Sequence, residues 1–201
     1  NSWNYDKDYD GVMAKYHQQI YAIDVAIGMI RAELEAQGVA DNTVIIYTGD
    51  QGFLLGEHDL MDKRWMYEES IRMPLIVHYP NMIDEPGRCD WLINNTDFAP
   101  TILGLAGVAT PDYMQGDSFV DALAGSEEPD NWREAIYYRY WMHMAHGHNN
   151  PGHFGVRTRQ HKLIFFYGTD YTNTHAGRLI ENRDGNRFGN STPAAWEFYD
   201  L

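Results

Sequence analysis

The sequence predicts an α/β fold, and three observations point to this class. Apolar residues recur at three- and four-residue steps over residues 11–37, the spacing of a helix with one apolar side. Two short apolar runs, residues 43–48 and 75–79, lack polar alternation and have the composition of strands buried on both faces. Helix-like and strand-like segments alternate over residues 1–108, which is the order typical of α/β domains.

The first helix is expected over residues 11–37, and Gly38 is a natural stop for it. One stripe of this helix is expected to be buried, and it consists of Ile20, Ile23, Ile27, Ile30 and Leu34. A glycine-rich loop over residues 49–60 follows the first strand. A second helix is expected over residues 63–72, ending before Pro74, because the residue before a proline disfavours helical backbone.

Beyond the second strand, a helix is expected over residues 97–105, with Pro100 in its first turn. The character of the sequence changes after residue 108, where a linker-like stretch precedes a short helix at about residues 118–124. We therefore expect two parts, an α/β portion over residues 1–108 and a smaller subdomain over residues 109–201.

The smaller subdomain is expected to contain an antiparallel sheet. Three aromatic-rich runs have strand character and are separated by turn-rich segments: residues 135–141, 154–167 and 196–201. Residues 173–191 are polar and glycine-rich without periodicity, so they are expected to form a loop.

The composition narrows the class of protein. The formal net charge is −14, the wrong sign for a uniform nucleic-acid-binding surface, so no nucleic-acid partner is expected. No apolar run approaches the ~18 residues of a membrane-spanning helix, so no span is expected. Cys89 is the single cysteine, which rules out an intramolecular disulfide.

A candidate site follows the first strand. Asp50 and Gln51 stand where ligands bind in open α/β sheets, at the carboxyl end of a strand, and offer oxygens suited to Ca²⁺ or Mg²⁺. The flanking glycines would let the backbone approach an ion or substrate closely. Lys63 is a mobile point charge suited to an oxyanion. The plain alternatives are a simple turn at Asp50 and Gln51, a solvated Lys63, and a hydrogen-bonded loop histidine at His58.

Longer motifs carry a resemblance to a known family. Residues 41–80 read DNTVIIYTGDQGFLLGEHDLMDKRWMYEESIRMPLIVHYP, residues 94–119 read NNTDFAPTILGLAGVATPDYMQGDSF, residues 153–166 read HFGVRTRQHKLIFF, and residues 196–201 read WEFYDL. Together they resemble the type I, formylglycine-dependent sulfatases of the alkaline phosphatase superfamily, over nearly the whole chain. The match is nearest to bacterial members with glutamine at the second metal position.

The resemblance implies an alkaline-phosphatase-like mixed sheet flanked by helices, with a C-terminal antiparallel-sheet subdomain, and it implies site roles. Asp50 and Gln51 match the last two protein ligands of a divalent cation, usually Ca²⁺, with Mg²⁺ as the alternative. Lys63 matches the lysine that contacts the sulfate group and helps to stabilise the leaving-group oxygen. His58 aligns with the histidine of the family's G-E-H segment, where a catalytic role and loop support are equal alternatives.

The family's nucleophile, a formylglycine made from a C/S-x-P-x-R motif, has no counterpart in these residues. Cys89 is followed by neither the proline nor the arginine, and the N-terminal pair of metal-binding aspartates is not found. The chain therefore resembles the C-terminal half of a sulfatase, and it is expected to need the N-terminal half for turnover. Family habit implies a periplasmic or secreted location.

Histidines gather at residues 143–153, where His143, His146, His148 and His153 lie close together in sequence. A zinc site, a plain polar loop and substrate recognition are the three alternatives. In the resembled family this segment covers the mouth of the active site, which favours His153, and less strongly Arg157, as substrate-binding residues. Glu68 and Arg72 match helix positions where a structural ion pair is expected.

The sequence thus predicts part of a sulfuric ester hydrolase acting on a sulfated carbohydrate. One alternative is a phosphoester or phosphonate hydrolase of the same superfamily, in which histidine tends to stand beside the metal-binding aspartate. The other is a non-catalytic remnant that binds sulfated glycans.

Overall fold

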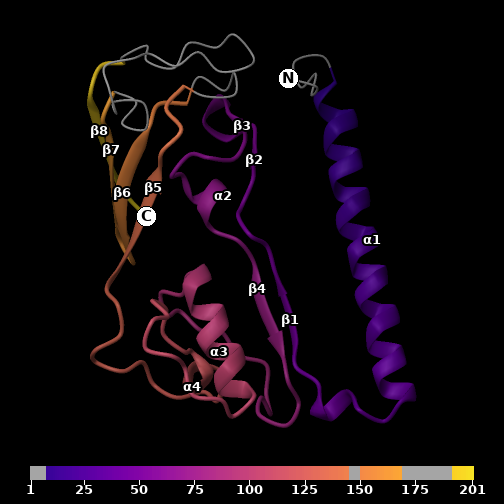
Figure 1. Cartoon of the computed structure of the whole chain (residues 1–201). Helices are drawn as coiled ribbons and strands as arrows, with labels where there is room; N and C mark the ends of the chain where they lie inside the picture. The colour runs from indigo at the N-terminus through magenta and orange to yellow at the C-terminus, as the bar shows by residue number, and fades with distance from the viewer. Residues whose placement is uncertain (1–7, 145–149, 169–191) are drawn as a thin grey trace. The chain divides into compact units, whose positions relative to one another are not determined.

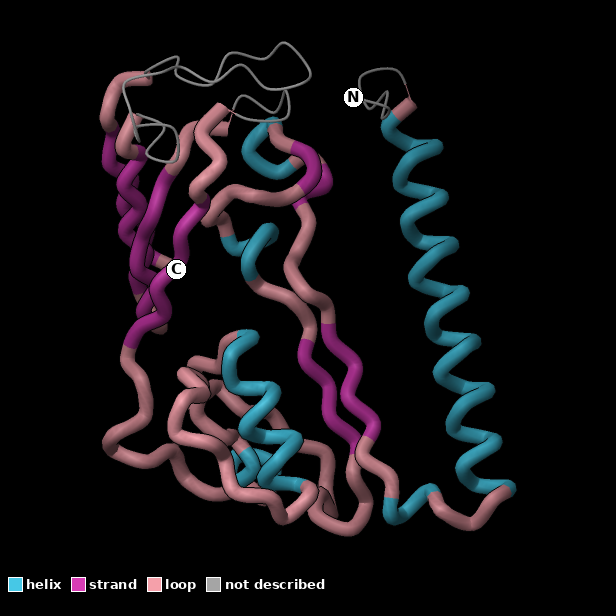
Figure 2. Tube along the Cα trace, viewed as in Figure 1, coloured by secondary structure: helices cyan, strands magenta, loops and turns pink. Residues whose placement is uncertain are grey.

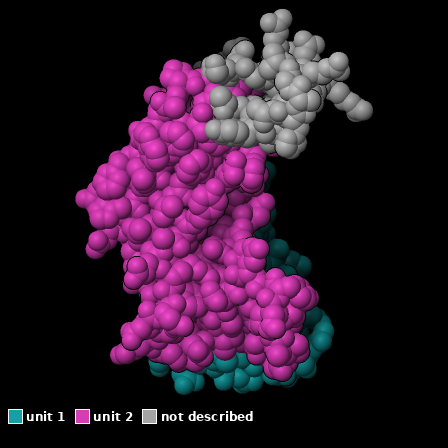
Figure 3. All heavy atoms as spheres, turned by 60° about the vertical axis from the view of Figure 1, so that its left-hand side comes forward, with its two compact units in different colours: residues 1–46, 77–86 teal, residues 47–76, 87–201 magenta. Residues whose placement is uncertain are grey.

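The computed structural model describes residues 8–144, 150–168 and 192–201. These fall into two compact units, one of residues 1–46 and 77–86 and the other of residues 47–76 and 87–201 (Figure 3). The loop expected over residues 173–191 lies outside the described residues. The expected division at residue 108 stays a prediction.

In the smaller unit, the long helix α1 spans Tyr9–Ala36, as its periodicity predicts (Figure 1). Asp8 caps its N-terminus, where its side chain accepts a hydrogen bond of 3.0 Å from the backbone N–H of Gly11. The expected burial of its apolar stripe is wrong, since no residue of α1 is buried and Ile30 remains 57% exposed. Sequence spacing sets which side of a helix is apolar, whereas burial needs a packing partner, and Ile20, Ile23 and Ile30 remain exposed among the described residues.

The two predicted apolar strands form, and they pair with each other. A short 3-10 helix, η1 (Ala40–Asn42), precedes β1 (Ile45–Thr48), and β1 neighbours β4 (Leu75–His78) in a two-stranded sheet. Burial on both faces is not observed, because β1 is only half-buried throughout and Ile76 in β4 is 60% exposed. Within the described residues, this sheet has no third strand to cover those side chains.

The segment between β1 and β4 was expected to be a loop followed by a helix, but it contains a small hairpin and only a short helix. A small antiparallel hairpin pairs β2 (Leu54–Leu55) with β3 (Met61–Asp62) across the 3-10 turn η2 (Glu57–Asp59). The helix predicted over residues 63–72 is wrong, since only α2 (Glu68–Ile71) is helical. Asp62 and Arg64 have φ angles of 81° and 86°, a left-handed backbone that no helix can include.

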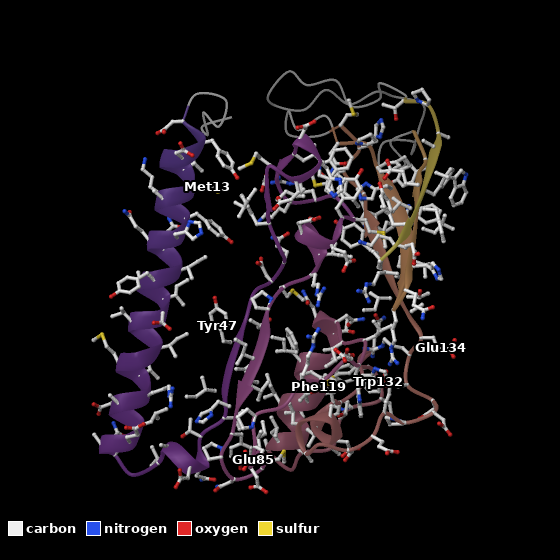
Figure 4. All side chains as sticks on the ribbon, turned by 180° about the vertical axis from the view of Figure 1, so that it is seen from behind. Met13, Tyr47, Glu85, Phe119, Trp132 and Glu134 are labelled. Atoms are coloured by element: carbon white, nitrogen blue, oxygen red, sulfur yellow. The ribbon has the colours of Figure 1, made fainter. Side chains whose placement is uncertain are left out.

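The α-helical part of the larger unit follows the prediction. The 3-10 turn η3 (Asn95–Asp97) leads into α3 (Phe98–Leu105), with Pro100 in its first turn, and α4 spans Val120–Leu123. Phe119, labelled in Figure 4, is 1% exposed and meets Phe98 edge-to-face. This aromatic contact joins the start of α3 to the start of α4.

A four-stranded antiparallel sheet forms the rest of the larger unit, in the order β5-β6-β7-β8 (Figure 2). Its strands are β5 (Ala135–Tyr140), β6 (His153–Thr158), β7 (His161–Phe166) and β8 (Ala195–Asp200). The single run expected over residues 154–167 is thus a hairpin of two strands. Met66, Ile164 and Phe166 form the buried cluster on one face, so the segment before α2 packs on this sheet.

These features confirm a mixed α/β fold with small antiparallel sheets. Within the described residues, no helix combines the length and the apolar character that crossing a membrane requires.

Candidate active site

Asp50 and Gln51 lie directly after β1, as the sequence predicts. The Gln51 side-chain amide donates to Asp50 Oδ2 at 3.2 Å, which places the amide group beside the carboxylate. Asn95 donates from its side chain to the backbone carbonyl of Asp50 at 3.0 Å. The Asp50 carboxylate is thus exposed while its backbone is held from η3.

The turn after Asp50 needs a glycine at position 52, but for a different reason from the expected approach to an ion or substrate. A Cβ at Gly52 would lie 2.1 Å from the carbonyl oxygen of Glu69, and the Gly52 N–H donates to Ser70 at 2.9 Å. The close approach is therefore to the backbone of α2 rather than to an ion or substrate. This contact fastens the Asp50 turn to α2.

His58 sits in the left-handed region, with a φ angle of 57°, on the turn between β2 and β3. Its ring stacks on Tyr67 at a centroid distance of 4.3 Å, and its Nε2 atom lies 3.5 Å from Glu69 Oε2. These contacts suit the loop-support alternative, and the catalytic role of His58 stays a prediction.

Lys63 lies between the two left-handed residues Asp62 and Arg64. The Arg64 guanidinium donates to the Asp62 carboxylate, so these neighbours neutralise each other. Among the described residues, the half-buried Lys63 ammonium has no hydrogen-bond or ion-pair partner. It is therefore available for an anion, as the predicted sulfate-binding role requires.

His153 opens β6 and is fully buried. Its Nδ1 atom lies 2.8 Å from the carbonyl oxygen of Pro151, and because a carbonyl only accepts, Nδ1 carries the proton. Burial lowers the pKa of His153, which keeps the imidazole neutral and leaves Nε2 as an acceptor. Nε2 has no hydrogen-bond partner among the described residues.

Two further buried polar atoms near His153 also lack partners in the described structure: the Tyr140 hydroxyl and Asn150 Oδ1. Tyr140 faces His153 in the β5–β6 register, with ring centroids 5.6 Å apart. The Asn150 side chain donates to the Arg64 carbonyl at 2.8 Å. Unpaired buried polar atoms are uncommon. These three are found close to His153, and substrate binding by His153 stays a prediction.

Arg157 has a different partner from the one expected. Its Nη2 atom lies 3.1 Å from Glu68 Oε2, and the Lys162 ammonium lies 2.6 Å from Glu68 Oε1. The two cations outweigh the opposing effect of burial, and the pKa of Glu68 is lowered. Glu68 thus forms a structural ion pair, although with Arg157 and Lys162 rather than Arg72. Substrate binding by Arg157 stays a prediction.

Asp97 anchors the segment that holds Asp50. It is fully buried, and its carboxylate accepts from the backbone N–H groups of Asn94 at 2.8 Å and Asp117 at 2.9 Å. Arg133 donates to both Asp97 oxygens, which raises the pKa of Arg133. The same residues therefore orient Asn95 and close the turn before α4.

A divalent cation fits this donor set in part. Asp50 and Gln51 supply a carboxylate and an amide oxygen, the hard ligands that Ca²⁺ and Mg²⁺ prefer. No group of three or more His, Cys, Asp or Glu side chains able to hold a metal is found in the described part of the chain. The two oxygens can thus form only part of a coordination sphere that takes ~6–8 ligands for Ca²⁺.

The histidine cluster is only partly described. His143 is fully buried and accepts from the Gly152 N–H at 2.9 Å, a structural contact. His146 and His148 lie outside the described residues, so the zinc alternative stays open.

Comparison with known proteins defines the class and then the family. The model for N-sulphoglucosamine sulphohydrolase, C-terminal, matches residues 56–178, and the model for Sulfatase matches residues 2–108. The chain aligns with a phosphonate monoester hydrolase of Agrobacterium radiobacter at a TM-score of 0.71 and 22% identity, over 96% of this chain and 36% of that one. That likeness shows a shared fold. The two family models, each matching more than half of the chain, show that the chain belongs to the sulfatase family.

Particular relatives are also sulfatases. The chain is 44% identical over 167 residues to an N-acetylglucosamine-6-O-sulfatase of Bacteroides thetaiotaomicron, covering 83% of this chain and 29% of the relative. It is 34% identical to the N-acetylglucosamine-6-sulfatase of Bos taurus, over 65% of this chain and 23% of that protein. A solved structure of BT4656 in complex with its substrate D-glucosamine-2-N,6-O-disulfate aligns at a TM-score of 0.74 and 36% identity, over 98% of this chain and 40% of that one. The chain thus spans less than half the length of these relatives.

Sequence reasoning missed several residues that the structure brings to the site. Asn95 and Asn150 act through side-chain hydrogen bonds to the backbone of distant residues, which leave no local pattern. Lys162 falls within the aromatic-rich run expected over residues 154–167, and it is 1% exposed in the structure. The available signal was a lysine within a strand of mostly apolar residues. A lysine is almost never fully buried unless it is paired, so such a position predicts an acidic partner nearby.

Proposed function

We propose that the protein hydrolyses sulfate esters of a glucosamine-containing carbohydrate, with residues 1–201 supplying the C-terminal part of the active site. The observation that carries this proposal is the 44% identity to an N-acetylglucosamine-6-O-sulfatase over 167 residues, which is 83% of this chain. The ligand in the BT4656 structure, D-glucosamine-2-N,6-O-disulfate, supports the same substrate class.

Asp50 and Gln51 would hold a divalent cation together with residues upstream of this chain. The cation, when bound, supplies positive charge where the sulfuryl oxygens become more negative in the transition state. Lys63 would donate to a sulfate oxygen and to the leaving-group oxygen, a role that its unpartnered ammonium supports.

The buried polar atoms around His153 would bind the sugar ring. Neutral His153 accepts a hydrogen bond at Nε2, and a sugar hydroxyl is a suitable donor. The Tyr140 hydroxyl and Asn150 Oδ1 offer further partners for hydroxyl or amide groups of the same ring. Trp65, whose ring lies 6.1 Å from that of His153, would border the apolar side.

The nucleophile would come from upstream residues, as a formylglycine made from a C/S-x-P-x-R motif. The isolated chain would then bind a sulfated sugar weakly and would not turn it over.

A phosphoester or phosphonate hydrolase is the second candidate. It is favoured by 34% identity over 128 residues to the multifunctional alkaline phosphatase superfamily protein PehA of Trinickia caryophylli. Gln51 favours the sulfatase instead, because phosphoester hydrolases tend to carry histidine at that position.

The test is a substrate comparison with the parent enzyme, the polypeptide that includes residues 1–201 and the upstream residues. We expect kcat/KM for N-acetylglucosamine-6-sulfate to exceed that for a phosphonate monoester by at least about 100-fold, a difference of roughly 2.7 kcal/mol in transition-state binding. A preference for the phosphonate ester would support the second candidate. Tight glycan binding without turnover, and an upstream sequence without the nucleophile motif, would support a non-catalytic remnant.

A further inference from the structure

Three charged side chains meet between α2 and the four-stranded sheet. Glu68 is the first residue of α2, whereas Arg157 and Lys162 are opposite each other in the β6–β7 register. Lys162 binds one Glu68 oxygen at 2.6 Å and Arg157 binds the other at 3.1 Å. We name these three residues the Glu68 clamp.

Removing the charged groups of the Glu68 clamp from water costs free energy. A contribution to stability therefore does not by itself explain why these residues are present. Lys162 is 1% exposed, and desolvation lowers its pKa in spite of the adjacent carboxylate. Buried ion pairs are frequently no more stabilising than apolar side chains of similar volume. What such a pair does provide is a defined position for the segment that carries it.

The segment that the clamp positions is the irregular backbone of residues 63–67. Asp62 and Arg64 are left-handed, so this stretch is not supported by a helical hydrogen-bond ladder. It is held by side chains instead: Met66 enters the core, and Tyr67 donates to Glu197 at 3.1 Å. Glu68 ends this stretch and is the point where it is fastened to β6 and β7.

Lys63 and Arg64 lie at the other end of the same stretch. The residues between Lys63 and Glu68 also contact the region of His153: the Trp65 ring lies 6.1 Å from that of His153, and the Arg64 carbonyl accepts from the Asn150 side chain at 2.8 Å. Glu68 is therefore one of the points that fasten the segment linking Lys63 to these contacts.

We propose that Glu68, Lys162 and Arg157 are positioning residues that set the place of Lys63 and Arg64 relative to His153 and its neighbouring polar atoms. This inference rests on the proposed function, since it assigns these residues to the same substrate site. None of the three needs to touch the substrate.

The experiment compares Lys162→Met with unaltered parent enzyme. Methionine keeps most of the volume, and Glu68 keeps Arg157 as a partner, so we expect the variant to fold with a modestly lowered melting temperature. Misplacement of Lys63 should lower kcat for a sulfated glucosamine by roughly 10- to 100-fold, with a smaller change in KM, because modest shifts of catalytic groups have effects of this size. Arg157→Lys keeps a cation beside Glu68 and should retain most of the activity, whereas Arg157→Met should resemble Lys162→Met.

The matched control is Leu163→Val, which lies on the same strand next to Lys162 and shortens a side chain that is 42% exposed and outside the Met66 cluster. It should leave both stability and kcat nearly unchanged. If Lys162→Met fails to fold, Arg157→Met provides the test, since its side chain is 18% exposed. The proposal is overturned if the folded methionine variants retain kcat as Leu163→Val does. Loss of the proposed function itself would instead appear as an unaltered parent enzyme without sulfatase turnover, and that result would refute both.

Discussion

Two buried charge clusters of the larger unit support the candidate site in different ways. Asp97 accepts from two backbone N–H groups and from Arg133, so it joins separate stretches of main chain. The Glu68 clamp consists of side chains alone, and it joins α2 to β6 and β7. A carboxylate bonded to backbone determines how the chain turns, whereas one bonded to side chains determines where an already formed segment lies.

The two clusters also lie next to different residues of the candidate site. The Asp97 cluster lies two residues from Asn95, whose side chain holds the Asp50 carbonyl at 3.0 Å. The Glu68 clamp lies five residues from Lys63 in sequence. The proposed metal-binding residues and the proposed sulfate-binding lysine therefore depend on different supports, which can be disrupted one at a time.

The largest expected effect is on stability, at Asp97. Asp97→Ala removes the acceptor for two N–H groups and leaves the Arg133 guanidinium without its buried partner, so we expect a loss of about 3–5 kcal/mol in the free energy of unfolding. Urea denaturation measures this loss. Asp90→Ala, which breaks the exposed ion pair with Arg88, is the control and should cost about 0–1 kcal/mol. Equal losses for the two variants would show that Asp97 does not anchor the turn.

Lys63→Ala should have the largest effect on catalysis. Loss of one donor to a developing anion typically lowers kcat by about 100- to 1,000-fold, and we expect that range in the parent enzyme. The melting temperature should hardly change, because Lys63 has no partner among the described residues. Turnover within a factor of about two of the unaltered enzyme would remove Lys63 from the sulfate site.

The Glu68 clamp should contribute to acid sensitivity. The folded-state pKa of Glu68 lies below its usual value of 4.5, so its stabilising contribution is present above pH 4.5 and is lost as pH falls through the lowered pKa. Unfolding measured between neutral pH and strongly acidic pH should therefore depend less on pH for Glu68→Gln than for the unaltered protein. Parallel pH profiles for the two proteins would contradict a lowered pKa at Glu68.

The smallest effect is expected at Asn95. Asn95→Ala removes one side-chain hydrogen bond to the Asp50 carbonyl, worth about 0.5–1.5 kcal/mol. Calcium titration of the parent enzyme should show an affinity lowered by less than about tenfold. Asp50→Ala, which removes a proposed ligand, should lower it much further. A larger effect at Asn95 than at Asp50 would reverse the roles given to these two residues.

Much of the fold could be predicted where a local pattern is sufficient. The spacing of apolar residues predicted α1, and the segment with Pro100 in its first turn predicted α3. Apolar and aromatic runs predicted β1, β4, β5 and β8 within a few residues, whereas β2 and β3 were not predicted and the run over residues 154–167 is two strands. The candidate site residues Asp50, Gln51 and Lys63 could also be picked out from the sequence. They belong to a motif with fixed spacing, which can be recognised even where the backbone is irregular.

The failures occur where a distant contact competes with local preference. Residues 63–72 have a composition compatible with a helix. However, Met66 packs in the core of the sheet and Glu68 pairs with Lys162 of β7. Arg64, just before them, has a left-handed backbone that a helix cannot include. The predicted burial of the apolar stripe of α1 is wrong for the opposite reason. Periodicity shows that one side of a helix is apolar, but it does not show that another element packs against that side.

The sequence by itself determined the class of fold, the sulfatase motifs and the residue types of the candidate site. These depend on local spacing, which is written in the order of residues. Only the tertiary structure decided that Arg157 and Lys162 bind Glu68, that His153 is buried, and that Asn95 supports Asp50. Each of these pairings joins residues from separate elements, and the free energy of such a contact depends on burial and geometry that no single stretch of sequence contains.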